Sequence, residues 1–397
     1  MNLEIRRILW VLLIAVTPLF PCLADARDSE GTAWENLHIG GYVQAGYMHI
    51  SASLPEPEGD QSWNEYRVQK RLNIRWDPAP NIACHWQMRT RLYAGDRVRQ
   101  FPAYAQEITE DYGLVDLSWT IIEEDNRILH YIPDRLYAEG DWQDWNIRVG
   151  RQRVNWGVNM ITNPNDIFNI YSIYDFDYPE RPGSDAIRIQ RFMGFASRME
   201  VAASPARNIE ESVAAVLYAF DRRGYDIQLI AGYFRERAAA GAGWAGSMGG
   251  TGLKGEAMVF SDIKGQDNGR DTDFIIAAAV DHMFANSLFM VIEGLYNSGG
   301  GADDFLLRAQ RLSPDNPSFS KYQVSAQFSY PFHPLLDGAI TLIGYPDEDA
   351  LFISPALTWS VAENLDARLV GQFFTGGGDS AIGSAGTLVS ASLQYHF

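Results

Sequence analysis

The chain has 397 residues, of which 46% are apolar and 21% charged, and its 50 acidic and 32 basic side chains give a net charge of −18. An isoelectric point near 4.8 argues against a nucleic-acid partner, because nucleic-acid-binding proteins need a basic face to displace phosphate counterions. Aromatic residues at 13% exclude a disordered protein, and a mean hydropathy of −0.19 without an apolar run of about 18 residues excludes a helical membrane protein.

The start of the chain has the features of an export signal. Two arginines precede an apolar stretch, and small residues then suit cleavage after Ala24 or Ala26. The exported chain would keep Cys84 as its single thiol, which offers no disulfide framework. We therefore predict a signal peptide over 1–26 and one domain over 27–397.

The remaining chain alternates between apolar and polar residues with a period of two. Over 66–76 the even positions include Tyr66, Leu72 and Trp76, whereas the odd positions are polar and mainly arginine. A helix would need apolar residues at a spacing of three to four. Segments of about ten alternating residues separated by turns are typical of a transmembrane β-barrel. A soluble β-sandwich is the alternative reading of this pattern.

We predict an all-β fold, an antiparallel up-and-down transmembrane barrel of about eighteen strands, within a range of 16–18. Single-chain bacterial barrels have an even number of strands, with short periplasmic turns and long outer loops. A strand over 113–124 would put the long 155–184 segment on the periplasmic side. We therefore predict 95–131 as one outer loop, and a hairpin about Gly249-Gly250-Thr251. The predicted strands are 37–50, 64–77, 82–94, 132–139, 144–154, 185–193, 197–204, 211–221, 225–236, 240–248, 252–260, 273–284, 287–297, 320–331, 335–344, 350–361, 365–375 and 385–397.

Arginines gather on the polar face of neighbouring predicted strands. A charge on the lipid face costs about 2–4 kcal/mol at the membrane midplane, so these side chains are expected to face the lumen. They form either a cationic ladder that guides anionic solutes, since arginine offers a fork of donors to carboxylate and phosphate, or a structural set paired with inward-folded acidic loops. The predicted pore-lining basic wall consists of Arg67, Arg71, Arg75, Arg89, Arg91, Arg135, Arg148 and Arg188, and the predicted opposing acidic wall consists of Asp226, Glu256, Asp281 and Glu293.

The segment 155–184 is too long for a turn and is rich in Asn, Asp and aromatic residues. Long loops without regular structure are usually functional or disordered. Its aromatic content makes it too apolar for solvent, so we predict that it folds into the pore and narrows it, with a plain outer lid as the alternative. The constriction-loop candidates are Asn163, Asp166, Tyr171, Tyr174, Asp175, Asp177, Tyr178 and Glu180.

No catalytic or metal site is predicted. The acidic residues of this segment, with Asp185, could offer oxygen ligands to calcium, but they lack a calcium-loop spacing. The seven histidines are scattered, Cys84 falls on the lipid-facing side of its strand, and neither a nucleophile motif nor a metal-ligand spacing is present. We expect no metal, no cofactor and no enzymatic activity.

Three motifs resemble a mostly uncharacterised family of porin-like bacterial outer-membrane barrels. They are GRQRVNWG at 150–157, NPNDIFN at 163–169 and DFDYPERPGSDA at 175–186. The chain ending at Phe397 is similar to the terminal signature of such barrels. The resemblance implies the fold and the outer-membrane location. Basic-ladder porins and alginate-export barrels are similar in architecture, which is an analogy of fold and charge only.

These observations lead us to expect a passive outer-membrane channel for small hydrophilic, anionic solutes. Its partners would be outer-membrane lipid, lipopolysaccharide and the solutes themselves, and the oligomeric state is left open. One alternative is a non-conducting barrel that anchors or exports acidic surface polysaccharide. Another is an outer-membrane hydrolase whose site is gathered from distant strands.

Overall fold

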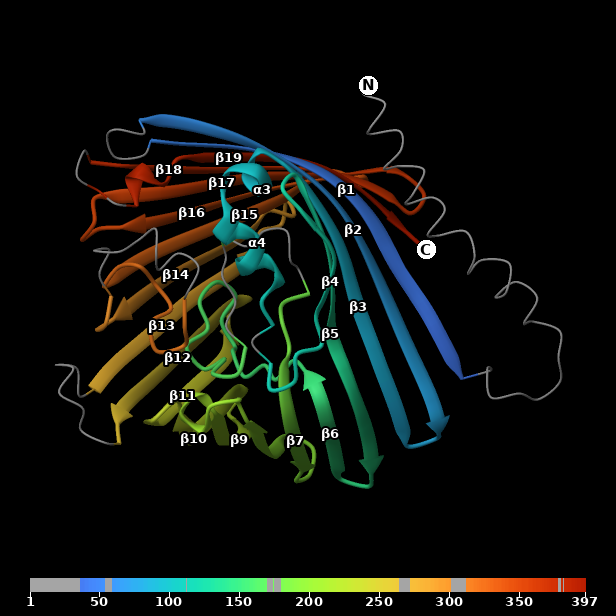
Figure 1. Ribbon diagram of the computed structural model, residues 1–397. Coiled ribbons are helices and arrows are strands. Elements are labelled where there is room, and N and C mark those ends of the chain that lie inside the picture. The colour runs from blue at the N-terminus through green and yellow to red at the C-terminus, as the bar shows by residue number, and fades with distance from the viewer. Residues whose placement is uncertain are drawn as a thin grey trace.

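The computed structural model describes residues 36–53, 59–111, 113–169, 174, 180–263, 272–300, 312–377, 380 and 382–397. The predicted signal peptide over 1–26 lies outside these residues. Antiparallel strands, paired in chain order, form a closed ring (Figure 1). Of the helices within the described residues, none has the length and apolarity that crossing a membrane requires.

The strands of the ring confirm the predicted all-β, up-and-down barrel. The first half consists of β1 (Leu37–Ser53), β2 (Asp60–Ala79), β3 (Ile82–Gly95), β5 (Arg127–Trp142), β6 (Trp145–Gln152), β7 (Ser184–Phe192), β8 (Ser197–Ser204), β9 (Val213–Arg222) and β10 (Tyr225–Phe234). The second half consists of β11 (Arg237–Met248), β12 (Thr251–Asp262), β13 (Thr272–Met283), β14 (Phe289–Asn297), β15 (Tyr322–His333), β16 (Leu336–Tyr345), β17 (Ala350–Ala362), β18 (Leu365–Gly376) and β19 (Thr387–His396). Because β19 pairs with β1, no edge of the ring is left open.

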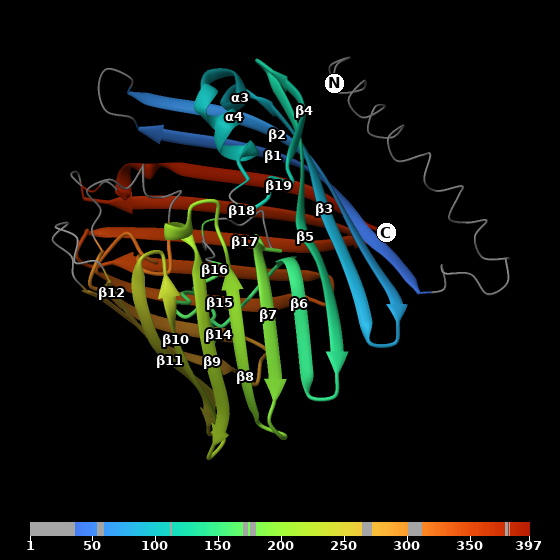
Figure 2. The same ribbon diagram turned by 60° about the horizontal axis from the view of Figure 1, so that its bottom comes forward.

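The predicted outer loop over 95–131 does connect two neighbouring strands of the ring, β3 and β5, but it contains regular structure and ends earlier than predicted. This stretch contains α3 (Asp96–Gln100), α4 (Pro102–Thr109) and β4 (Trp119–Glu124), and β5 already begins at Arg127. The two helices lie within the outline of the ring in Figure 1 and at its end, beside β2 and β4, in Figure 2. Val98 and Tyr104 pack against Tyr93 and Ile128 of the barrel. Among the described strands β4 pairs with β5 alone, so it adds a hairpin to the ring and leaves the strand parity even.

Short turns gather at one end of the barrel, as Figure 2 shows for β5–β6 and β7–β8. At the turn between β11 and β12, Gly249 and Gly250 have φ values of 61° and 83°. Positive φ at both central residues gives a turn whose twist matches that of the strands, which confirms the predicted hairpin. The long connections lie at the other end and include the short helical turns η2 (Ile209–Glu211) and η3 (Gly383–Ala385).

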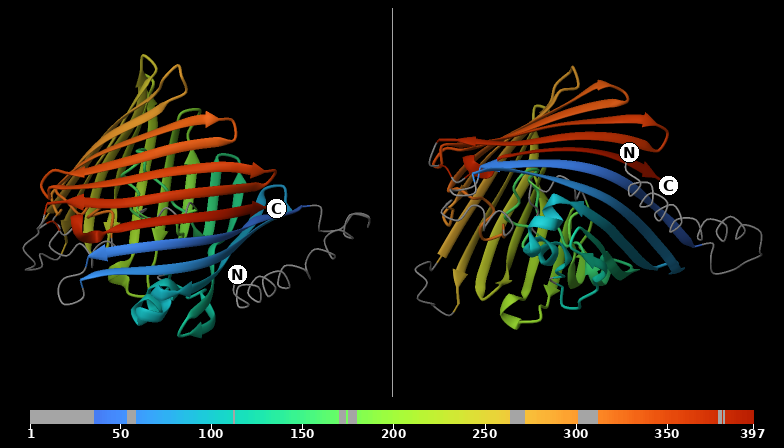
Figure 3. Two further views of the ribbon diagram at one scale, coloured as in Figure 1. Left: turned by 90° about the horizontal axis from the view of Figure 1, so that it is seen from above. Right: turned by 45° about the horizontal axis from the view of Figure 1, so that its top comes forward.

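The largest apolar core lies inside the barrel, where the sequence pattern predicted a polar surface. Leu217, Met258 and Ile275 on β9, β12 and β13 are fully buried and belong to one cluster with Trp156 and Ile167, which follow β6. The prediction that the polar side of each alternating strand faces the interior is therefore wrong for these strands. An inward chain segment removes this part of the wall from water, so apolar side chains are favoured there. Figure 3 shows the barrel from two further sides, and in its left view the orange and red strands of the second half cross in front of the green strands of the first half.

The barrel closes through a close backbone approach at Gly41. Its N–H donates to the carbonyl oxygen of Phe397 at 3.1 Å, and the N–H of Phe397 donates back to Gly41 at 3.0 Å. A Cβ atom at this position would lie 2.1 Å from the Arg71 carbonyl oxygen, which belongs to the neighbouring strand β2. Glycine is therefore required where three strands meet.

We predict that Gly41→Ala impairs closure, because the added methyl group forces β1 and β2 apart. The expected result is a smaller folded fraction after refolding into detergent, measured by the shift in electrophoretic mobility between unheated and boiled samples. Gly46→Ala is the matched control, since a Cβ there meets Ser392 Cβ at an ordinary 3.6 Å. Equal folded fractions for the two variants would contradict the steric explanation.

Candidate functional site

The chain between β6 and β7 enters the barrel and packs against its wall over the residues that the structure describes, 153–169, 174 and 180–183, here called the inward segment. Val154, Trp156 and Ile167 are at most 2% exposed. A turn at the Asn-Pro-Asn-Asp sequence directs the chain back, with the Asp166 N–H donating to the Asn163 carbonyl oxygen at 3.1 Å. The structure thus brings the first part of the predicted constriction loop into the interior.

Glu256 on β12 accepts hydrogen bonds from three backbone N–H groups of the inward segment. Its carboxylate lies 2.6 Å from the nitrogen of Val158, 2.8 Å from that of Asn159 and 2.8 Å from that of Asn165. The side chain is completely buried. Because these N–H groups have no strand partner, the carboxylate replaces the acceptors that a β-ladder would supply.

The other predicted acidic-wall residues have different surroundings. Glu293 on β14 is buried and accepts the N–H of Thr162 at 2.9 Å. Asp281 on β13 pairs with Lys254 at 2.9 Å, and Asp226 is exposed near a short turn. Two of the four carboxylates therefore bind the inward segment.

Polar side chains from other strands add contacts that the sequence analysis missed. Gln228 donates to the Trp156 carbonyl oxygen at 2.5 Å, and the Trp156 indole N–H donates to Glu200 at 2.7 Å. Asn165 donates to the Ala242 carbonyl oxygen at 3.0 Å. The buried Asp166 lies 3.9 Å from Arg153. A polar residue between apolar neighbours, such as Gln228 between Ile227 and Leu229, was the only signal in the sequence for the contacts made by strand residues.

Arginines of the predicted basic wall converge on buried carboxylates. Arg71 and Arg89 flank Asp134, with nitrogen–oxygen distances of 2.5 and 3.1 Å, and all three side chains are at most 6% exposed. Arg135 donates to the carbonyl oxygens of Glu180 and Arg181 at 2.8 and 2.9 Å. The returning end of the inward segment is therefore bound to β5.

The remaining basic-wall residues lie toward either end of the interior. Arg148 pairs with Glu139 at 2.5 Å, and Arg188 donates to the Asn146 oxygen at 2.6 Å. Arg75 is half exposed beside Asp77 near a short turn. Arg91 donates to the Tyr93 hydroxyl at 2.7 Å, and Arg67 lines a small pocket with Glu65 and Arg368.

Glu180 and Tyr174 are two further residues of the inward segment that contact the barrel wall. Glu180 accepts the Tyr42 hydroxyl at 2.9 Å, next to Arg71 at 3.8 Å. Tyr174 hydrogen bonds to the Tyr345 hydroxyl, and its carbonyl oxygen accepts from Gln372 at 2.8 Å. The candidates Tyr171, Asp175, Asp177 and Tyr178 lie outside the described residues.

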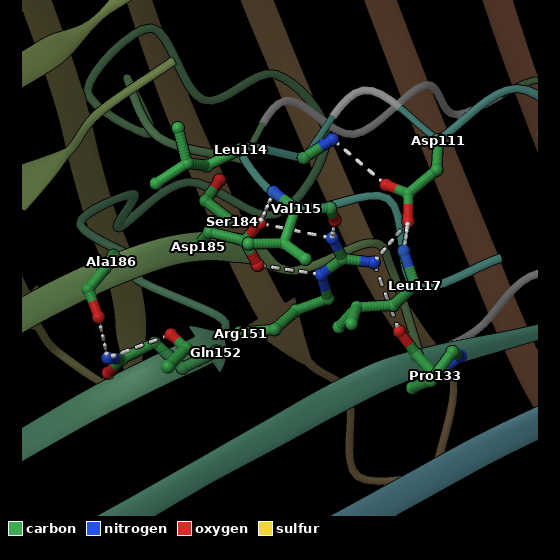
Figure 4. Close-up of polar contacts among 12 residues, drawn as sticks. Asp111, Leu114, Val115, Leu117, Pro133, Arg151, Gln152, Ser184, Asp185 and Ala186 are labelled. Atoms are coloured by element: carbon green, nitrogen blue, oxygen red, sulfur yellow. Dashed lines mark hydrogen bonds and ion pairs between the residues drawn. The ribbon is translucent and has the colours of Figure 1, made fainter. Parts of the chain in front are cut away.

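Arg151 joins the barrel to its outer loops and was not among the predicted site residues (Figure 4). Its guanidinium donates to Asp185 and Asp111, each at 2.8 Å, and to the Val115 carbonyl oxygen at 2.8 Å. Asp185, considered above for calcium, thus has a cationic partner. Within the described residues, His, Cys, Asp and Glu form no group of three suited to a metal ion.

No protein-family model and no curated protein matches the chain. Solved structures match it in fold. OccAB4 from Acinetobacter baumannii aligns with a TM-score of 0.56 and 9% identity, over 91% of this chain and 98% of its own. OccK11 (OpdR) and OccK7 (OpdD) from Pseudomonas aeruginosa align with TM-scores of 0.55 and 0.56 and identities of 10% and 9%, each over 91% of this chain and over 96% and 99% of their own.

These neighbours are outer-membrane porins. The fold is that of a porin-like barrel. At identities near 10% the likeness shows the architecture alone, so the roles of individual residues are argued from this structure. The closed barrel with apolar residues on its outer face is the architecture of a protein that spans an outer membrane.

We predict that Glu256→Gln loosens the inward segment. Hydrogen bonds to a charged acceptor contribute about 1.5–3 kcal/mol each, and a glutamine offers one acceptor oxygen to three donors. The free energy of unfolding in detergent should fall by about 2–3 kcal/mol, measured by urea titration. Asp226→Asn, which neutralises an exposed carboxylate on β10, is the control. Equal unfolding midpoints for both variants would argue against this role.

We also predict that acid releases the outer loop bound by Arg151. Burial alone would raise the pKa of Asp111, but the Arg151 guanidinium and the N–H groups of Gly113 and Leu117 outweigh it and lower the pKa. A carboxyl with a lowered folded pKa stabilises the fold above its unfolded pKa of about 3.9, and this stabilisation is lost as the pH falls through the lowered value. Hydrogen exchange of the 113–118 amides, corrected for intrinsic rates, should therefore accelerate below about pH 4. Constant protection between pH 7 and pH 2 would be inconsistent with this account.

Proposed function

We propose that the protein is a passive channel for small hydrophilic solutes in the bacterial outer membrane, narrowed by the inward segment. The observation that carries the proposal is the attachment of this segment to opposite parts of the barrel, through Glu256 on β12 and Arg135 on β5. A barrel of eighteen strands is wide enough to leave an aqueous passage. A segment bound on both sides, with its apolar side chains packed against one part of the wall, narrows that passage.

An anionic preference is the finer part of the proposal. The cluster around Asp134 holds three guanidinium groups and two carboxylates. Arg71 and Arg89 contact the Asp134 carboxylate, and Arg71 also lies 3.8 Å from that of Glu180. Arg135 binds the main-chain carbonyl oxygen of Glu180 beside them. The cluster therefore carries an excess positive charge next to the inward segment. In a passage with low-dielectric walls such a charge raises the local concentration of anions. The proposal includes contact with lipopolysaccharide and assigns no enzymatic step.

We expect the purified protein to conduct ions in a planar bilayer and to favour anions. Arg135→Gln should lower the ratio of anion to cation permeability, derived from the reversal potential in a potassium chloride gradient. Arg127→Gln is the control, because Arg127 lies in the outer β4–β5 hairpin, paired with Glu124 at 2.9 Å. Absence of conductance would overturn the channel, and a permeability ratio insensitive to Arg135 would overturn the anionic preference alone.

A further inference from the structure

Arg191 lies on the outer surface of the barrel, at the end where the short turns gather. Ala186 on the same strand, β7, is buried in the interior core. Because successive side chains of a strand point to opposite faces, Ile187, Ile189 and Arg191 point outward. Arg191 is exposed and is paired in register with Trp145, the first residue of β6 after the β5–β6 turn.

The Arg191 guanidinium has an aromatic partner and no anionic one. Its central carbon lies 5.2 Å from the centre of the Trp145 ring. The Arg191 side chain forms no ion pair or hydrogen bond with any residue that the structure describes. At the edge of the apolar band an arginine keeps its stem against apolar surface and its charge among the headgroups. Because a guanidinium is a fork of donors matched to phosphate, this position is suited to a lipid phosphate.

An exposed carboxylate, that of Asp144, lies beside this arginine. Asp144 is in the β5–β6 turn, and its carbonyl oxygen accepts the N–H of Phe192, the residue after Arg191, at 2.8 Å. Its carboxylate also forms no ion pair or hydrogen bond within the described part of the chain. A neighbouring guanidinium and carboxylate complement a headgroup that carries both a phosphate and an ammonium group.

An apolar groove of about 640 Å³ lies on the same outer face, beside the short-turn end of the barrel. Ala138 on β5 is paired in register with Cys84 on one side and with Val149 on the other. Two small side chains thus form a floor beside large indole rings, which leaves room for an extended apolar chain. The lining includes Trp76, Cys84, Trp86, Leu136, Ala138 and Val149.

Arg191 and the groove lie in the same half of the membrane and within reach of one lipid. Val149 is four residues from Trp145 along β6, roughly 13 Å at about 3.3 Å per residue, or roughly 9 Å of depth at a tilt of about 45°. Ala138 is two strands from Arg191, roughly 10 Å across the sheet. The apolar band is about 25 Å tall, so the groove extends from its short-turn side toward its middle. Short turns face the periplasm, and this half therefore borders the inner leaflet.

We propose that this face binds one phospholipid of the inner leaflet that has an amine-bearing headgroup. Its phosphate contacts the Arg191 guanidinium, its ammonium group contacts Asp144, and one acyl chain lies in the groove. Such a lipid combines both charges with a long apolar chain, which matches the arrangement of the site. A second copy of this chain fits less well, because the convex wall of a barrel covers a groove without filling it. The inference rests on the proposed function as an outer-membrane channel.

The test is native mass spectrometry of the full chain in detergent, titrated with phosphatidylethanolamine. We expect one lipid to bind, and Arg191→Met to weaken binding roughly tenfold or more, as the loss of a charge-assisted contact would. Asp144→Asn should remove the preference for phosphatidylethanolamine over phosphatidylglycerol, which lacks the ammonium group. Ala138→Trp should abolish binding by filling the groove.

Two matched controls change the outer face elsewhere. Lys70 on β2 also points outward, since its neighbours Gln69 and Arg71 are buried inside the barrel, and it lies six residues beyond Trp76. Lys70→Met removes an outward cation far from the short turns and should leave binding unchanged. Ala326→Trp, on the outward side of β15, should do the same.

Three results would overturn the proposal: equal affinity for diacylglycerol, which lacks the phosphate, equal affinity of the Arg191→Met variant, or a lipid-free dimer as the main species. An unchanged headgroup preference in Asp144→Asn would overturn the assignment of the ammonium group. Bilayer conductance of the same samples separates this inference from the proposed function. A variant that conducts normally but no longer binds the phospholipid supports the site. A wild-type channel that conducts but never binds it refutes the site and leaves the channel standing.

Discussion

The interior of this barrel depends on the completely buried carboxylate of Glu256. An irregular segment inside a barrel carries N–H groups that no strand can pair, and each one left unpaired costs about 1–3 kcal/mol. Glu256 accepts three such groups, and Glu293 accepts a fourth from Thr162. The inward segment can therefore be both irregular and buried, because β12 and β14 supply the acceptors. The apolar cluster around Trp156 then excludes water from these hydrogen bonds.

Positively charged side chains on the opposite side of the interior also hold the inward segment in place. Arg135 donates to the carbonyl oxygens at which the inward segment returns to the wall, and Arg71 and Arg89 enclose Asp134. Of the two interpretations that the sequence left open, a structural set of arginines paired with inward-folded acidic loops matches the contact of Arg71 with Glu180, whereas Asp134 belongs to the wall strand β5. The other interpretation, a cationic ladder that guides anionic solutes, depends on the guanidinium charge that remains after this pairing. The arginines of the interior can therefore serve both roles: the paired groups stabilise the structure, and the excess positive charge is left to attract solutes.

The period-two alternation predicted nearly all barrel strands to within a few residues, because each strand has one face toward lipid and this constraint acts locally on every segment. The requirement for an even number of strands, together with the lengths of the turns, then predicted how the strands follow one another around the barrel. The inward direction of Arg71 and Arg89 followed from the cost of charge in lipid. The sequence did not predict the hairpin strand β4 within the loop over 95–131, because β4 pairs with β5 outside the ring and alternation cannot reveal which partner a strand will have.

The sequence by itself determined the class of fold, the closed ring and the face on which most charges lie, since these depend on residue type and spacing. Only the tertiary structure decided what the charges bind. Arg151 follows Gly150, whose φ of 120° departs from regular strand geometry, and its partner Asp111 lies 40 residues away in the chain. Glu256 and Val158 are 98 residues apart. Contacts at such separations depend on where the folded chain returns, which no local pattern of residues records.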